Sequence, residues 1–264
     1  MAARAASMTI VPLEPVRRSE SAAWARRALA GGVYLMWLLA TWLFEKRVNL
    51  FTRYDPAGRA LYALLANVAI GTVIAGVGAR ATLRAGQPVP WRTRPLLLAL
   101  TAAVGGLVVT RAAPPAAREP LVLVNAFAQI LPTSIAEVVV CWLLVGGAAR
   151  EAAKRLGPVP ATLIAVVVAD VFFAVYHVAH SPPFDRPEMM AFLAIPGAVT
   201  GVLVFVVRDR AVAILGQNLF AMIGITRSAD VGVFRHPFVW AYAVAIVAAL
   251  AAFLALRPAG PRAS

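Results

Sequence analysis

The stretch PTSIAEVVVCW, residues Pro132–Trp142, places a carboxylate in the middle of an apolar segment. From Glu119 to Ala149 the sequence contains no Lys or Arg that could pair with Glu137. A segment this long and this apolar predicts a helix that crosses a membrane. An ionisable side chain at membrane depth costs about 2.5–3.5 kcal/mol even on lenient insertion scales, so Glu137 indicates a functional site.

The whole chain, like that segment, is rich in apolar residues. It has 264 residues, of which 61% are hydrophobic and 14% charged, and its mean hydropathy is +0.78. The surface of a soluble domain of this size needs more charge, so the sequence predicts an all-α, polytopic membrane protein. We expect a bundle of about eight transmembrane helices, over residues 29–44, 60–79, 95–110, 120–149, 159–180, 189–207, 211–226 and 237–256.

The positive charge of the chain follows these expected helices. The net charge is +13, and the basic residues lie in the tails and in short loops, a pattern that sets membrane topology and does not indicate a nucleic-acid partner. Of the 25 Lys and Arg residues, 16 fall on the side that holds both termini. We therefore expect a cytoplasmic tail at 1–28, a single transmembrane domain at 29–257 and a second cytoplasmic tail at 258–264. The Ala- and Arg-rich composition suggests a bacterial inner membrane.

A polar stripe runs along the fourth expected helix. Its members recur every four residues: Asn125, Gln129, Thr133, Glu137 and Cys141. On a helix this spacing places them on one face, which must contact protein or trapped water because lipid cannot satisfy polar groups. Thirty helical residues rise about 45 Å, more than the hydrocarbon core needs. We therefore expect Pro132 to kink this segment, so that residues 121–131 are tilted, interfacial or a separate half-helix.

Two other expected helices carry polar residues in apolar surroundings. The fifth contains ADVFFAVYHVAH, in which Asp170 and His177 lie seven residues apart and share a face. The seventh contains ILGQNLF, with the amides of Gln217 and Asn218. If these helices meet the fourth, a carboxylate can activate water, a histidine can orient it or protonate a leaving amine, and an amide can stabilise an oxyanion. Peptide hydrolysis by these groups needs no metal or cofactor.

The order of these residues resembles the motifs of the CPBP family, intramembrane proteases that include type II CAAX prenyl endopeptidases and bacteriocin-processing enzymes. That family has about eight spans, with E-E-x-x-x-R on the fourth, F-x-x-x-H on the fifth and H-x-x-x-N on the seventh. The matching stretches here are Ala136–Cys141, Phe173–His177 and Ile214–Asn218. The resemblance covers about residues 95–226.

The resemblance implies a membrane-embedded endopeptidase that cleaves a membrane-proximal or C-terminal bond of a membrane-anchored protein or peptide. Glu137 and His177 would activate water, and Asn218, with Gln217, would hold the oxyanion. The sequence departs from the family where Ala136 replaces a Glu, Cys141 an Arg and Ile214 a His. Asp170 or Gln217 would then substitute for the missing groups.

Other functions fit the same residues. Glu137 can be a structural acid that is bonded to a neighbouring helix, in a family member that has lost its chemistry and acts as a partner or scaffold. The polar stripe can line a path for a proton or small solute. Cys141 can be a nucleophile paired with His177, as in exosortase-type sorting enzymes, and Glu137, His177 and Asp170 can bind a metal. His180, directly before SPP, is expected at the membrane interface.

Overall fold

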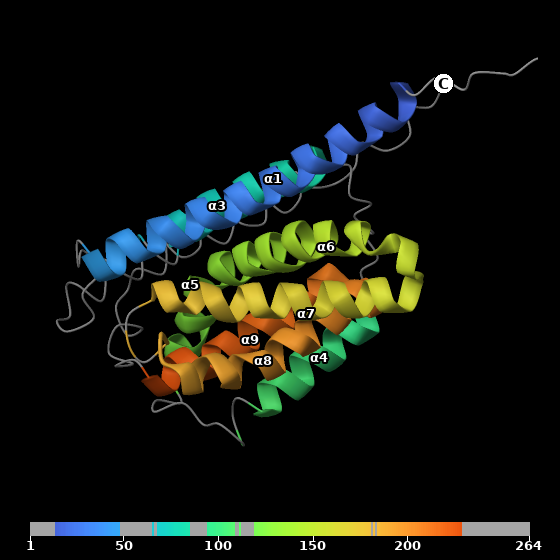
Figure 1. Cartoon of the computed structure of the whole chain (residues 1–264). Helices are drawn as coiled ribbons and strands as arrows, with labels where there is room; N and C mark the ends of the chain where they lie inside the picture. Colours follow the sequence, from blue (N-terminus) through green and yellow to red (C-terminus); the bar gives the residue numbers. More distant parts are fainter. Residues whose placement is uncertain are drawn as a thin grey trace, which may run out of the picture.

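The computed structural model describes residues 14–47, 65, 68–84, 94–108, 111, 119–180, 182 and 184–228, and every regular element among them is helical (Figure 1). Four of the described spans are long and apolar enough to cross a bilayer: Trp24–Arg47, Pro120–Ala152, Pro158–Ala179 and Pro187–Val207. Shorter apolar helices cover Val68–Thr82, Pro95–Leu107 and Arg210–Gly224. The prediction of a helical membrane protein is confirmed. The number of eight spans stays a prediction, because the expected span 237–256 lies outside the described residues.

The helices begin and end where the local sequence favours it. Their bounds are α1 Glu14–Trp42, α3 Gly71–Arg84, α4 Pro95–Leu107, α5 Pro120–Glu137, α6 Gly147–Ala152, α7 Pro158–Tyr176, α8 Pro187–Val202 and α9 Arg210–Ser228. Four of them, α4, α5, α7 and α8, begin with proline. Proline is favoured there because its φ is already helical and the first helical position needs no N–H. One π-helical turn, Leu43–Arg47, extends α1.

A single long helix forms the centre of the bundle. α5 continues through a π-helical segment, Val138–Gly146, into α6, which gives 33 helical residues. Of its most apolar stretch 89% of residues are buried, against 28–39% in the other three long spans. α1, α3, α7 and α9 all pack against it. The expected half-helix before Pro132 is therefore wrong: helices packed on several sides outweigh the one backbone hydrogen bond that proline removes.

The outer surface of the bundle is apolar, as a lipid environment requires. On α7 every fourth residue is exposed, by 45–67%: Val159, Leu163, Val167, Val171 and Val175. The buried face of the same helix carries small residues, among them Ala165 and Ala169. A Cβ added at Gly146 would lie 3.0 Å from the Ala169 Cβ, so the central helix and α7 cross closely. Large apolar residues outside and small residues between helices are typical of membrane bundles.

The starts of α4 and α9 are held together by one carboxylate. Asp209 is fully buried, and its Oδ2 accepts a hydrogen bond of 2.7 Å from the backbone N–H of Arg94. Its Oδ1 accepts one of 3.2 Å from the N–H of Val212 in the first turn of α9. The loops that precede these helices therefore lie at the same end of the bundle. That agrees with the alternation of spans expected from the sequence, whereas the side of the membrane on which this end lies stays a prediction.

Candidate functional site

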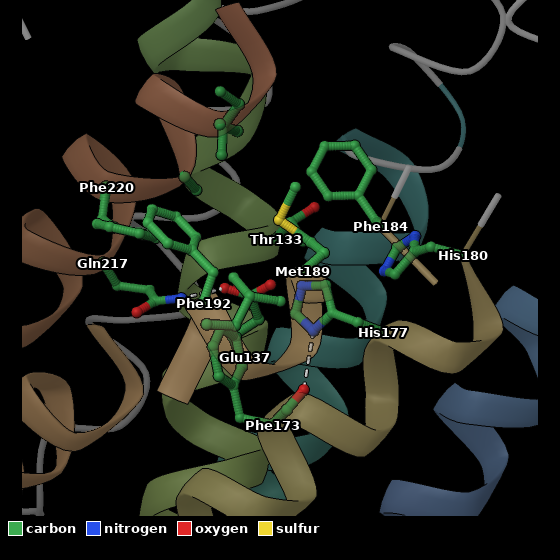
Figure 2. Close-up of a pocket in the computed structure, with 14 residues that line it drawn as sticks. Thr133, Glu137, Phe173, His177, His180, Phe184, Met189, Phe192, Gln217 and Phe220 are labelled. Carbon is green, nitrogen blue, oxygen red and sulfur yellow. Dashed lines mark hydrogen bonds between the residues drawn. The ribbon is translucent and has the colours of Figure 1, made fainter. Parts of the chain in front are cut away.

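An apolar pocket of about 70 Å³ opens beside the central helix (Figure 2). Residues from α5, α7, α8 and α9 and from the chain after α7 line it: Ile130, Thr133, Glu137, Phe173, His177, His180, Phe184, Met189, Phe192, Leu193, Gln217, Phe220, Ala221 and Gly224. Most of these side chains are aliphatic or aromatic. The few that can do acid–base or oxyanion chemistry are Glu137, the two histidines and Gln217, and they come from three different helical segments.

The carboxyl group of Glu137 is held by a chain of hydrogen bonds. Glu137 is only 5% exposed, and its Oε2 accepts a hydrogen bond of 2.7 Å from Gln217 Nε2. Gln217 Oε1 accepts one of 2.9 Å from the Thr200 hydroxyl of α8. Because a carboxylate only accepts, the amide nitrogen of Gln217 must face Glu137, which leaves the amide oxygen to accept from Thr200. Three helices thus fix one carboxyl group at the pocket wall.

His177 lies in the 3₁₀ turn His177–Ala179 that ends α7, and its ring is fixed in a defined orientation. Its Nδ1 lies 2.8 Å from the carbonyl oxygen of Phe173. A carbonyl can only accept, so Nδ1 carries a hydrogen, and in the neutral ring Nε2 is then an acceptor. Figure 2 shows Glu137 between Gln217 and His177 in the pocket, with His177 bonded to Phe173 at its other edge.

A second pair of titratable groups borders the pocket, and the sequence did not predict it. Glu45, from the π-helical turn after α1, is 4% exposed, and its Oε1 lies 2.7 Å from His180 Nδ1. The His180 ring is 5.3 Å from the His177 ring, centroid to centroid. Glu45 therefore lies within the apolar span Trp24–Arg47, beyond the end of the helix expected at 29–44. His180 lines the pocket, and its expected position at the membrane interface stays a prediction.

The sequence contains a signal for Glu45 that is easy to misread. In FEKR, residues 44–47, the acid precedes two basic residues and looks like part of an interfacial charge cluster. In the structure Lys46 instead donates a hydrogen bond of 2.9 Å to Asp185, in the chain after α7. The helix continues to Arg47, so that Glu45 is buried. His180 is brought over His177 because residues three apart eclipse in a 3₁₀ turn.

Two of the predicted site residues lie outside the pocket. Asn218 is bonded to α5 at both ends: its Nδ2 donates to the Phe127 carbonyl at 3.1 Å, and its Oδ1 accepts from the Ser134 hydroxyl at 3.2 Å. Asp170 is half-buried on α7 and faces α8 at Gly197, where an added Cβ would collide with its Oδ1. Neither residue lines the pocket with Glu137. Of the two adjacent amides, Gln217 is the one that reaches the carboxyl group.

The polar stripe predicted on the fourth helix faces protein. Asn125, Gln129, Glu137 and Cys141 are buried, and Thr133 lines the pocket, so this prediction is confirmed. Cys141 is fully buried in the π-helical segment and does not line the pocket. Among the described residues, no group of three His, Cys, Asp or Glu side chains is placed to hold a metal ion.

Comparison with known proteins leaves this site without a counterpart. No family model matches the chain, and no curated protein or solved structure is significantly similar to it. The resemblance to the CPBP motifs thus stays a prediction from the residues, and the function must be argued from the site itself.

Proposed function

We propose that the chain is an intramembrane endopeptidase of the CPBP type in which Glu137 activates the attacking water. The observation that carries the proposal is the placement of a buried carboxyl group, bonded to Gln217, in the wall of an apolar pocket that also contains His177. A carboxylate general base, a neutral imidazole and an amide donor are the groups that peptide hydrolysis without a covalent nucleophile requires.

The chemistry begins with water bound between Glu137 and His177. Gln217 occupies Oε2 of Glu137, which leaves Oε1 to accept a proton as the water oxygen attacks the peptide carbonyl carbon. His177 Nε2 accepts the second hydrogen of that water and orients its lone pair towards the carbonyl. When the tetrahedral intermediate collapses, the carbon–nitrogen bond breaks and the proton held by Glu137 passes to the leaving amine.

The oxyanion of the intermediate needs a hydrogen-bond donor close to Glu137. The amide nitrogen of Gln217 has two hydrogens, of which one is bonded to Glu137. The second supplies the donor, in place of Asn218, which does not line the pocket. Thr200 keeps the nitrogen of Gln217 on this side, and such preorganised donors are worth about 3–4 kcal/mol to a transition state.

The pair formed by Glu45 and His180 supports His177 at the edge of the pocket. The carboxyl group of Glu45 orients the His180 ring, which lies against the His177 ring. Where the family has a second glutamate next to the catalytic one, this chain has Ala136. Glu45 contributes a second buried carboxyl group from another helix, which fixes the His180 ring beside the neutral ring of His177.

The lining of the pocket selects the substrate. Phe184, Met189, Phe192 and Phe220 also line the pocket, and the rings of Phe192 and Phe220 are 5.6 Å apart. Such a lining favours a large apolar side chain next to the scissile bond. The substrate is a membrane-anchored protein or peptide that is cut near the membrane surface, in a bacterial inner membrane with both termini of the enzyme in the cytoplasm.

The test is to compare protein termini in membranes that contain the wild-type chain or the Glu137→Gln variant at equal abundance. We expect new termini, flanked by large apolar residues, only with the wild type, because an amide cannot accept the proton of water. Asp170→Asn is the matched control, since it makes the same carboxyl-to-amide change outside the pocket, and it is expected to keep the new termini. If neither the wild type nor Glu137→Gln gives new termini, the chain acts as a non-enzymatic partner or a transporter.

A further inference from the structure

A second hollow, of about 750 Å³, lies at the end of the bundle where α6 ends and α7 begins. Three arginines from three separate connections line it: Arg94 before α4, Arg150 in the last turn of α6, and Arg208 between α8 and α9. In the described part of the chain no acidic side chain forms an ion pair with any of them. The hollow is separate from the pocket of Glu137, with which it shares no lining residue.

Hydrogen bonds of the backbone hold two of these arginines close together. Asp209 bonds the backbone of Arg94 to the start of α9 and so places Arg94 beside Arg208. Arg208 itself has φ 58° and ψ 38°, a left-handed conformation that is unfavourable for a residue with a Cβ. Glycine would fit this backbone better, so the presence of arginine at position 208 indicates a use for its side chain.

Apart from Thr162, the remaining lining of the hollow is apolar, and part of it faces outwards. Val159, Leu163 and Val206 line it and are each at least 60% exposed. Val159 and Leu163 are also the first members of the exposed stripe on α7, which continues through Val167 to Val175 along the outer surface. A ligand bound here would have its anionic part among guanidinium groups and its apolar part along a helix that faces lipid.

We propose that this hollow is a binding site for an anionic phospholipid, with the phosphate among Arg94, Arg150 and Arg208 and one acyl chain along α7. Guanidinium groups bind phosphate oxygens in pairs of parallel hydrogen bonds, which an ammonium group cannot do. A soluble phosphate compound would satisfy the arginines alone. The exposed apolar wall that continues from the hollow favours a lipid.

Clusters of basic residues at one end of a membrane protein also arise from topology alone, and Arg155 provides the comparison. It lies in the 3₁₀ turn Lys154–Leu156 between α6 and α7, is exposed, and does not line the hollow. A topological role depends only on the number of charges at this end. Binding at a defined site, in contrast, weakens only when the arginine removed is one that lines the hollow.

The experiment is a lipid titration of the full-length chain in neutral detergent, read by native mass spectrometry. The probes are dioleoyl phosphatidylglycerol, dioleoyl phosphatidylcholine and, as a soluble headgroup, glycerol 1-phosphate. We expect the wild type to bind phosphatidylglycerol in preference to phosphatidylcholine. Each arginine near an anionic headgroup contributes about fivefold in affinity, so the double variant Arg150→Gln, Arg208→Gln should bind it about 25-fold more weakly. Arg155→Gln should bind within about twofold of the wild type.

Each other outcome contradicts the proposal. If Arg155→Gln weakens binding as much as Arg150→Gln, the effect is one of general charge. If glycerol 1-phosphate binds as tightly as the lipid, the ligand is a soluble phosphate compound. Should the double variant fail to fold, Arg208→Gly replaces it: glycine suits the left-handed backbone and removes the side chain that carries the guanidinium group. Wild-type affinity in a folded Arg208→Gly variant would also overturn the proposal.

Discussion

The hydrogen bond between Gln217 and Glu137 predicts an energetic coupling that a double-mutant cycle can measure. The three variants are Glu137→Met, Gln217→Met and the combination, which keep side-chain volume nearly constant while removing one or both partners. Interhelical hydrogen bonds in membrane proteins average about 0.6 kcal/mol and reach about 1.7. This bond is short, at 2.7 Å, buried, and made to a carboxyl group, so its value should be at the upper end.

We therefore expect Gln217→Met alone to lower the free energy of unfolding by about 2 kcal/mol, because it leaves a buried carboxyl group without its donor. With Glu137→Met already present, the same change should cost less than about 1 kcal/mol, the remaining cost coming from the unbonded hydroxyl of Thr200. The coupling energy is then about 1–1.5 kcal/mol.

The assay is unfolding in mixed micelles, followed by circular dichroism. The control cycle combines Glu137→Met with Thr82→Val in α3, whose hydroxyl bonds only the Gly78 carbonyl of its own helix, at 2.8 Å. These two changes should be additive within about 0.5 kcal/mol. If the Glu137–Gln217 coupling is no larger than that of the control cycle, Gln217 is not the residue that holds the carboxyl group, and the arrangement of the site is wrong.

Three further predictions follow from single contacts. Thr200→Val should slow processing about tenfold, measured as an initial rate, because the Gln217 amide is no longer fixed; an unchanged rate would exclude this role. Gly146→Ala should lower the thermal midpoint, since its Cβ would press on Ala169 at a cost of about 1–3 kcal/mol. Gly32→Ala, with open space around its Cβ, should leave the thermal midpoint unchanged. Equal midpoints for Gly146→Ala and Gly32→Ala would refute the close crossing. Asp209→Ala should cost about 1–3 kcal/mol through the loss of both backbone hydrogen bonds, with Asp209→Asn retaining part of the stability; a neutral Asp209→Ala would contradict the geometry at this end.

Much of the bundle could be predicted because membrane helices are encoded by local hydropathy. The long apolar runs gave the positions of the four described spans, and the four-residue spacing of polar residues gave the face of the central helix that is buried. The convergence of Glu137, His177 and Gln217 on one pocket was also predictable, because lipid cannot solvate such side chains and so directs them inwards.

The remaining features depend on geometry that hydropathy does not encode. Adjacent residues of a helix point about 100° apart, so the sequence could not tell whether Gln217 or Asn218 faces Glu137. Glu45 was missed because the apolar run ends one residue earlier, whereas the helix continues to Arg47. The π-helical segment after Glu137, which contains Cys141, packs against four neighbouring helices and has no sequence signal of its own.

The most direct test of the central claim is the rate of processing, in membranes with equal amounts of each variant, by the wild type, Glu137→Gln and Asp170→Asn. Both substitutions replace a carboxyl group within the membrane by an amide of the same shape, and only Glu137 lines the pocket. The account predicts that Glu137→Gln slows processing by about 10²–10⁴-fold, the usual contribution of a general base, while Asp170→Asn stays within about threefold of the wild type. Equal losses in the two variants, or processing by Glu137→Gln at the wild-type rate, would contradict it.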